Sequence, residues 1–210
     1  MCCLGFDCSG KDVVAGLWYG VDDYTEVCLK NKSGTENLMQ AIDICLKQAN
    51  LKIEDVEYIG VCVGPGSWTG SRVAVSTLNG LVGGLKRLPK LFTFDVFDLI
   101  SYNEIGDKDP YFLVVPAYGE YIYVKEQNKN SDIAPSFMSK SEFLEKLNGY
   151  KNYGLEKIFD ETIVVEPRLK ELLKRKSLSN SFVGVAEIEP MYLRLSQAEL
   201  QFKQKTEGGV

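Results

Sequence analysis

The chain has 210 residues, 45% hydrophobic and 25% charged, which is typical of a folded protein with one or two domains and excludes a disordered or collagen-like chain. Its net charge of −5 argues against a protein that grips RNA or DNA alone, because such proteins neutralise phosphates with a basic face. Histidine is absent, which excludes an imidazole base, a Ser-His-Asp or Cys-His nucleophile and any histidine-containing metal site.

The first residues do not predict a targeting segment. Met1–Asp7 has no basic region and reaches an aspartate almost at once, unlike a signal peptide. No apolar run approaches the roughly 18 residues that cross a bilayer. We therefore expect a cytoplasmic protein with no membrane partner.

The first hundred residues predict a mixed sheet with helices packed on it. Three β-rich runs with short Gly/Asp connections predict antiparallel hairpins. Ser33 with Glu36 forms the signature of a capping box, and apolar residues at helical spacing follow as far as Asn50. The order then continues as strand, helix, strand, helix, which is typical of parallel crossovers. The β-rich runs are Cys2–Cys8, Val13–Tyr19 and Thr25–Lys30, and the later elements are Val56–Val63, a helix to about Leu85, Leu91–Thr93 and Val96–Tyr102.

The polar stretch Asn103–Pro110 is the best candidate boundary, so we expect an N-terminal lobe (1–103) and a smaller C-terminal lobe (104–210). In the second lobe, the sequence predicts a hairpin formed by Tyr111–Val115 and Glu120–Glu126. Two helices are expected after it, Ser139–Leu147, capped by Ser141, and Pro167–Lys176. The polar end, Gln201–Val210, predicts a frayed terminus.

Six cysteines lie in the first third of the chain, at positions 2, 3, 8, 28, 45 and 62, without a C-x-x-C pair. Zinc sites need clustered pairs, and disulfide frameworks belong to secreted chains. We therefore expect buried, reduced thiols that act as small hydrophobic groups.

The sharpest motif is the run Gly64-Pro65-Gly66-Ser67-Trp68-Thr69-Gly70-Ser71-Arg72, between a buried strand and a helix. A helix N-terminus suits an anion. However, the run lacks the Lys of a phosphate loop, and its glycine spacing misses the dinucleotide pattern by one residue. The alternative is structural: the glycines make a tight turn that lets the helix approach the sheet.

Two further features keep both a structural and a functional interpretation. The helix after the glycine run carries Ser76, Gly80 and Gly84 at four-residue spacing, which favours close packing either on the protein itself or on a partner's helix. Asp7-Cys8-Ser9-Gly10 ends the first strand. Such a turn binds metal and phosphate in actin-like ATPases, but alone it is only a turn signal.

Together these motifs resemble the TsaB (YeaZ) family of tRNA threonylcarbamoyladenosine biosynthesis proteins. Asp7-Cys8-Ser9 stands where that family has Asp-Thr-Ser. Gly64–Arg72 is similar to its GPGSFTGLR signature, with Trp68 for Phe and Ser71 for Leu. Glu189-Pro190-Met191-Tyr192-Leu193-Arg194 is similar to its closing E-P-x-Y-L-R.

The second lobe departs from the family pattern. Where the family often has Asp-Ala-Arg before a hairpin, this chain has Pro116-Ala117-Tyr118, and the first helix opens on Gly34-Thr35-Glu36 in place of His-Ser-Glu. Roles of the missing Asp and Arg are therefore not transferred to this chain.

The resemblance implies an α/β actin-like ATPase (RNase H-like) fold with two lobes, the second reduced, and a protein without chemistry, cofactor or metal of its own. Its catalytic relative TsaD holds a metal through a histidine pair, which this chain lacks. TsaD is the implied partner, TsaE joins a larger complex, self-association is a further option, and contact with tRNA is only indirect. The implied contact uses the first two helices, Glu36–Ala49 and Thr69–Leu85, with candidate residues Leu38, Met39, Ile42, Arg72, Ser76, Asn79 and Gly80; Asp7 and Ser9 form a degenerate phosphate turn.

Two other functions stay open at this stage. An actin-like small-molecule kinase or ATPase would need phosphate-gripping turns in both lobes, and only Asp7–Gly10 is evident. A peptidase would use Ser9 or Ser67 as nucleophile, without a histidine to activate it.

Overall fold

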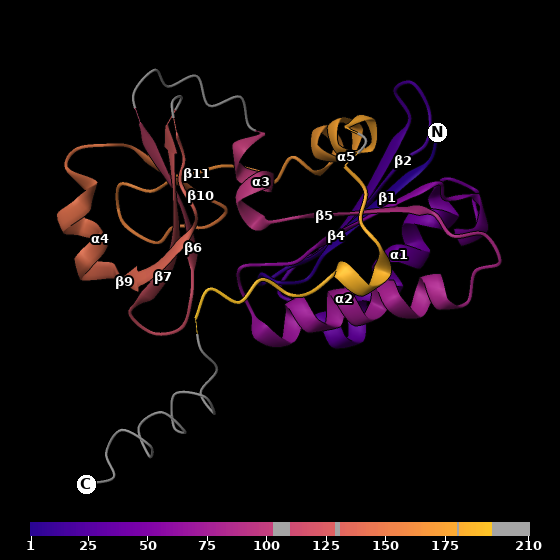
Figure 1. Ribbon diagram of the computed structural model, residues 1–210, viewed down its shortest axis with the longest axis horizontal. Coiled ribbons are helices and arrows are strands. Elements are labelled where there is room, and N and C mark those ends of the chain that lie inside the picture. Colours follow the sequence, from indigo (N-terminus) through magenta and orange to yellow (C-terminus); the bar gives the residue numbers. More distant parts are fainter. Residues whose placement is uncertain (103–109, 129–130, 180, 195–210) are drawn as a thin grey trace, which may run out of the picture.

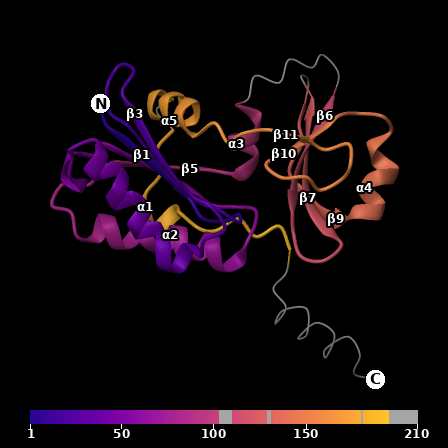
Figure 2. The ribbon, with the colours of Figure 1, turned by 180° about the vertical axis from the view of Figure 1, so that it is seen from behind.

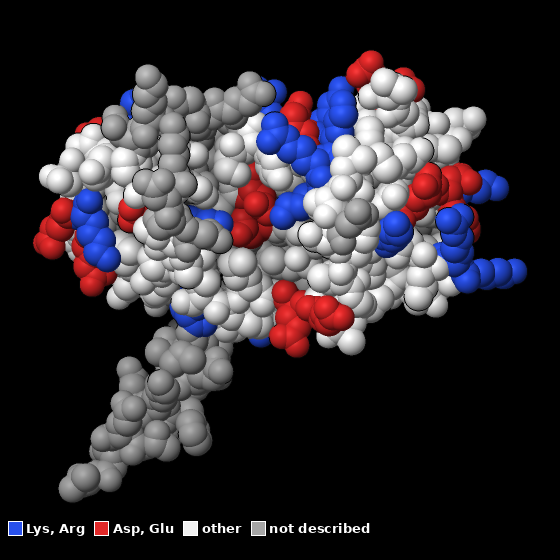
Figure 3. All heavy atoms as spheres, turned by 45° about the horizontal axis from the view of Figure 1, so that its top comes forward, with Lys and Arg blue, Asp and Glu red and all other residues white. Residues whose placement is uncertain are grey.

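The structure is a computed structural model that describes residues 1–102, 110–128, 131–179 and 181–194. It places them in two β-sheets with helices packed on them (Figure 1). On the face shown in Figure 3, acidic and basic side chains are interspersed, and both kinds lie along the junction between the two halves.

The first sheet has five strands in the order β3-β2-β1-β4-β5. Strands β1, β2 and β3 form the predicted antiparallel meander, whereas β4 and β5 join it in parallel. β1 and β2 are buried along their whole length, as expected of central strands covered on both faces. The strands are β1 (Cys3–Asp7), β2 (Val13–Trp18), β3 (Tyr24–Leu29), β4 (Tyr58–Cys62) and β5 (Lys90–Phe94).

Helices cover both faces of this sheet (Figure 2). On one face, α1 (Gly34–Gln48) and α2 (Trp68–Gly83) enclose a core with side chains such as Leu4 and Phe6 of β1. On the other face lie α3 (Val96–Ser101) and α5 (Leu169–Leu178). Two short 3-10 turns, η1 (Ile53–Asp55) and η2 (Val185–Glu187), lie in connections.

Glycines let α5 lie directly on the sheet. Gly5 of β1 pairs with Gly16 of β2. A Cβ at Gly5 would stand 2.3 Å from Leu173 Cδ2, and one at Gly16 would stand 2.9 Å from Leu169 Cδ2. A larger residue at either position would therefore push α5 away.

The second sheet has the order β11-β10-β6-β7-β8, and β9 also pairs with β7. The predicted hairpin is present as β6 and β7. Alternating residues of β6 face opposite sides: Phe112 and Val114 form a core with Phe143 of α4, while Leu113 and Val115 join the core beneath α3 and α5. The elements are β6 (Tyr111–Pro116), β7 (Tyr121–Asn128), β8 (Ser131–Asp132), β9 (Ser136–Ser139), α4 (Lys140–Leu147), β10 (Asn152–Gly154) and β11 (Ile163–Val164).

The end of the described chain returns to the first sheet. After α5, Val183 bridges to Leu91 of β5, and the Met191 N–H donates to the Val63 carbonyl at 2.7 Å. Figure 1 shows this segment crossing beneath the first sheet toward the second. The division at residues 103 and 104 stays a prediction, because residues 103–109 lie outside the described ones.

Several local predictions change. Ser33 is the N-cap of α1, but its side chain makes no capping hydrogen bond. In α4 the cap is Ser139, which forms a capping box with Glu142, and not Ser141. Five cysteines are buried free thiols as expected, whereas Cys28 is exposed on β3. The predicted frayed end, Gln201–Val210, lies outside the described residues.

Candidate functional site

The glycine run forms a tight turn pressed against the end of β1. The Gly64–Pro65 peptide is cis and Gly64 has φ +106°, a conformation that favours glycine. A Cβ at Gly66 would stand 2.4 Å from the Ser9 carbonyl oxygen, and one at Gly70 would stand 2.0 Å from that of Cys8. These glycines therefore have the predicted structural role: without side chains, they let the glycine run and the start of α2 pack against the backbone of Cys8 and Ser9.

The N-terminus of α2 uses several of its donors inside the protein. Ser67 is the N-cap, and its Oγ accepts from Gly70 N at 3.1 Å. The Ser67 N–H donates to the Ser9 carbonyl at 2.7 Å, and the Ser71 N–H donates to the Ser67 carbonyl. These three donors are thus not available to a phosphate, and Ser67 has a capping role.

Asp7 and Ser9 form a closed pair at the end of β1. The Asp7 carboxylate accepts from the Ser9 amide at 2.8 Å and from the Ser9 hydroxyl at 2.7 Å. Asp7 is only 6% exposed, and this burial raises the pKa of its carboxyl, although the Ser9 hydrogen bonds oppose the shift. The Ser9 hydroxyl therefore donates to the Asp7 carboxyl group, which holds it at the end of β1.

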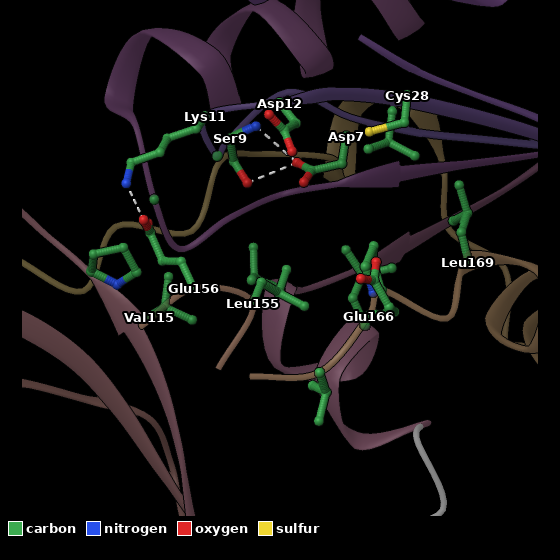
Figure 4. Close-up of a pocket in the computed structure, with 18 of the residues that line it drawn as sticks. Asp7, Ser9, Lys11, Asp12, Cys28, Val115, Leu155, Glu156, Glu166 and Leu169 are labelled. Carbon is green, nitrogen blue, oxygen red and sulfur yellow. Dashed lines mark hydrogen bonds and ion pairs between the residues drawn. The ribbon is translucent and has the colours of Figure 1, made fainter. Parts of the chain in front are cut away.

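A cavity of about 340 Å³ lies between the two sheets, with Asp7 and Ser9 in its wall (Figure 4). Lys11 of the first half and Glu156 of the second are among the residues that line it, and they form an ion pair. Apolar side chains, among them Val115, Leu155 and Leu169, line the rest. Such a mixed cavity is of the size that holds a small ligand.

The glycine run and the closing motif, Glu189–Arg194, meet beside this cavity. Tyr192 stacks on Trp68 with ring centroids 4.5 Å apart, and the Arg72 Nε donates to the Tyr192 hydroxyl at 2.9 Å. The Arg194 guanidinium lies 5.1 Å from the Trp68 ring centroid and 4.6 Å from that of Tyr118. The closing motif therefore clamps the start of α2.

The predicted contact residues of α1 and α2 separate into two groups. Leu38 and Ile42 are each 1% exposed and fill the first core, so these two residues cannot contact a partner in this conformation. Met39 is 51% exposed, and Arg72, Ser76, Asn79 and Gly80 also lie on the surface.

The glycines in the second half of α2 and at its C-cap are not needed for packing within the chain. A Cβ at Gly80 or Gly83 would meet nothing within 4 Å, and one at Gly84 would touch only the Leu81 carbonyl. A shallow groove of about 400 Å³ runs along the same helix, lined by Thr69, Arg72, Val73, Ser76 and Thr77. Packing within the chain therefore does not require a glycine at position 80, whose surroundings are open.

Sequence reasoning missed the second-lobe contribution to this region. Lys11 and Glu156 pair across 145 positions, and Tyr118 reaches Arg194 from the β6–β7 turn. Only the alternation of aromatic residues after Tyr118 could have indicated a ring-lined face. Among the described residues, no three His, Cys, Asp or Glu are grouped so as to hold a metal ion. In the same part of the chain, no helix has the length and apolar character to cross a membrane.

Solved structures with this fold are known. The chain is similar to YeaZ from Pseudomonas aeruginosa, with 16% identity and a TM-score of 0.71, over 91% of this chain and 99% of that one. A second structure, described as an uncharacterized protein with similarity to peptidase YeaZ from Pseudomonas aeruginosa, gives 15% identity and a TM-score of 0.71 over 92% and 99%. The predicted two-lobed, actin-like α/β fold is confirmed.

The family comparison covers most of the sequence. The family model of TsaD, described as tRNA N6-adenosine threonylcarbamoyltransferase, matches residues 29–187. That range includes α1, the glycine run and most of the second lobe. The chain therefore belongs to the TsaD family, whose role is in the threonylcarbamoyl modification of tRNA.

Proposed function

We propose that this chain is a non-catalytic partner subunit that binds and supports TsaD in forming N6-threonylcarbamoyladenosine next to the anticodon of tRNAs that read A-starting codons. The observation that carries the proposal is the open glycine face of α2, where Gly80 and Gly83 meet nothing of their own chain. Glycine in a helix interior costs about 1 kcal/mol relative to alanine. Since no contact within the chain requires these glycines, we interpret them as a surface on which another helix can pack closely.

The sequence supports a supporting role over a catalytic one. In TsaD, as the resemblance implies, a pair of histidines holds the metal. This chain has no histidine, so it cannot form such a metal site. A protein of this family without those side chains can still contribute by docking on a relative that has them. Docking assists TsaD only if the bound form favours its competent conformation.

The proposed contact surface consists of Met39, Arg72, Ser76, Asn79 and Gly80, the exposed part of the predicted set. Two adjacent helices can supply about 800 Å² per partner, the usual size of a stable interface. The same surface could serve a second copy of this chain, and TsaE would join the assembly elsewhere.

The experiment is capture of TsaD from the same organism by the Gly80→Leu variant. Since the space around Gly80 is open and leucine is the better helix former, the variant should fold with unchanged circular dichroism. We expect capture at least about tenfold weaker, because the added side chain holds the helices apart. Glu145→Leu, on the exposed side of α4, is the matched control and should bind normally. Unchanged capture by Gly80→Leu would refute this interface.

A second candidate is a small-molecule kinase or ATPase, which the cavity beside Asp7 and Ser9 favours. It predicts magnesium-dependent ATP hydrolysis by the isolated chain that is lost in Asp7→Asn. The partner-subunit proposal predicts no turnover by the isolated chain, with or without this substitution.

A further inference from the structure

A row of aromatic rings and arginine crosses from the first half of the molecule to the second. Its members, which we call the aromatic row, are Tyr192, Trp68, Arg194, Tyr118 and Tyr121. Consecutive members lie 4.5, 5.1, 4.6 and 5.4 Å apart, measured between ring centroids or from the Arg194 Cζ to a centroid. The row is thus continuous from the start of α2 in the first half to β7 in the second.

Much of this aromatic surface is uncovered. Tyr118 is 52% exposed, Tyr121 38% and Tyr192 45%. Rings that serve only the core would be buried, and a cluster of exposed rings marks a binding surface. Tyrosine, tryptophan and arginine planes are the groups on which proteins stack nucleobases.

A cavity of about 540 Å³ opens along the row, and cations surround it. Lys11, Lys140, Lys157 and Arg194 line it, against a single carboxylate, Glu156, which pairs with Lys11. This local excess of positive charge contrasts with the net charge of −5 of the chain.

The other acidic groups near this cavity are weak competitors. Glu120 lies 3.8 Å from the Lys140 ammonium and Asp160 lies 3.1 Å from that of Lys157, and these carboxylates are 84% and 93% exposed. Exposed ion pairs of this kind contribute little stability. A phosphate can therefore replace either carboxylate at small cost.

We propose that this cavity binds a single-stranded segment of RNA, with bases stacked on Tyr118 and on the Trp68–Arg194 pair and phosphates at Lys140 and Lys157. Several rings in succession suit consecutive bases, whereas a free nucleotide offers one base, and the open rim suits a strand that passes through. The inference rests on the proposed function only in taking tRNA as the source of the strand. It replaces the expectation of purely indirect tRNA contact, which the family resemblance implied and which the net charge of −5 favoured.

The experiment is a fluorescence anisotropy titration of the full chain, alone and with TsaD, using a labelled single-stranded oligoadenylate of about eight nucleotides. Tyr118→Ala should weaken binding about tenfold, the usual effect of losing one stacked base. Tyr118→Phe, which keeps the ring, should bind like the wild type. Lys157→Gln should reduce the slope of log affinity against log salt by about 0.7, the value for one lost phosphate contact on a single strand.

Two controls lie outside the cavity. Tyr150→Ala removes a ring of similar exposure (40%) in the second half, and Lys174→Gln removes an exposed charge on α5; both should leave binding unchanged. No RNA binding by the wild type, equal loss in the controls, or full competition by equimolar AMP would overturn the proposal. TsaD capture, measured on the same variants, should be unchanged, so failure here leaves the docking proposal standing.

Discussion

Trp68 and Tyr192 lie 124 positions apart, in motifs that the sequence marks only as separate signatures. In the structure the two motifs hold each other in place: Tyr192 stacks on Trp68 and accepts a hydrogen bond from Arg72 at the start of α2. Each motif could be recognised from the sequence, but the contact between the two motifs could not be predicted from it. Contacts of such separation depend on the path of the whole chain and leave no local periodicity.

The clamp predicts a graded loss in Tyr192 variants. Tyr192→Phe removes only the hydrogen bond from Arg72 and should lower the free energy of unfolding by about 0.5–1 kcal/mol. Tyr192→Ala also removes the ring contact and should cost about 1–2 kcal/mol in total. Urea denaturation measures both values. Tryptophan fluorescence should shift to the red only in Tyr192→Ala, because Trp68 becomes more exposed while Trp18 stays buried; equal stability of all three proteins would contradict the clamp.

Asp95 predicts a pH dependence of stability. Its carboxylate caps α3 by accepting from Asp98 N at 2.7 Å. Burial, helped by the nearby Asp98 charge, raises the pKa of Asp95 from 3.8 to about 6. Because the folded state binds the Asp95 proton more tightly than the unfolded state does, protonation of Asp95 stabilises the fold. This stabilisation is complete below pH 3.8 and is lost as the pH rises through about 6.

Asp95→Asn cannot ionise and still caps the helix. The variant should therefore gain on the wild type between about pH 4 and pH 7, by on the order of 2 kcal/mol. Urea unfolding at the two pH values measures the difference. A wild-type advantage that grows with pH would contradict the assigned shift.

At the scale of elements, the long patterns in the first half predicted the structure well. The three-strand meander, α1, β4 and α2 all follow from alternation, helical spacing and turn residues. The strands β8, β9, β10 and β11 were missed, since they have two to four residues each and too few positions to reveal a period. Their pairing is imposed by the neighbouring strands and not by their own sequence.

Helix α2 offers an internal comparison of two glycines. A Cβ at Gly70 would stand 2.0 Å from the Cys8 carbonyl oxygen, whereas one at Gly80 would meet nothing. Gly70→Ala should destabilise the protein by about 2 kcal/mol or more through overpacking. Gly80→Ala should stabilise it by about 0.5–1 kcal/mol. Thermal denaturation of the two variants decides the matter, and the same sign for both would contradict the distinction between a packed and an open face of α2.

At the scale of the molecule, the two sheets share a core. Leu113, Val115, Tyr123 and Tyr153 of the second sheet pack with Phe92 and the α3 and α5 side chains of the first half. The sequence predicted two lobes but not this shared core, since its buried residues come from elements far apart in the chain, namely β1, β2, β4, β5, β6, β7, β10, α3 and α5. The cavity, the Lys11–Glu156 pair and the aromatic row all lie where the two halves meet.

The central claim, that this chain acts by supporting TsaD, is tested most directly by reconstituting tRNA modification from the purified components of one organism. N6-threonylcarbamoyladenosine in the tRNA is quantified by mass spectrometry with the chain present, omitted, and alone. We predict product when TsaD and this chain are combined, a large loss when the chain is left out, and none from the chain by itself. Equal product without the chain, or product from the chain alone, would contradict the account.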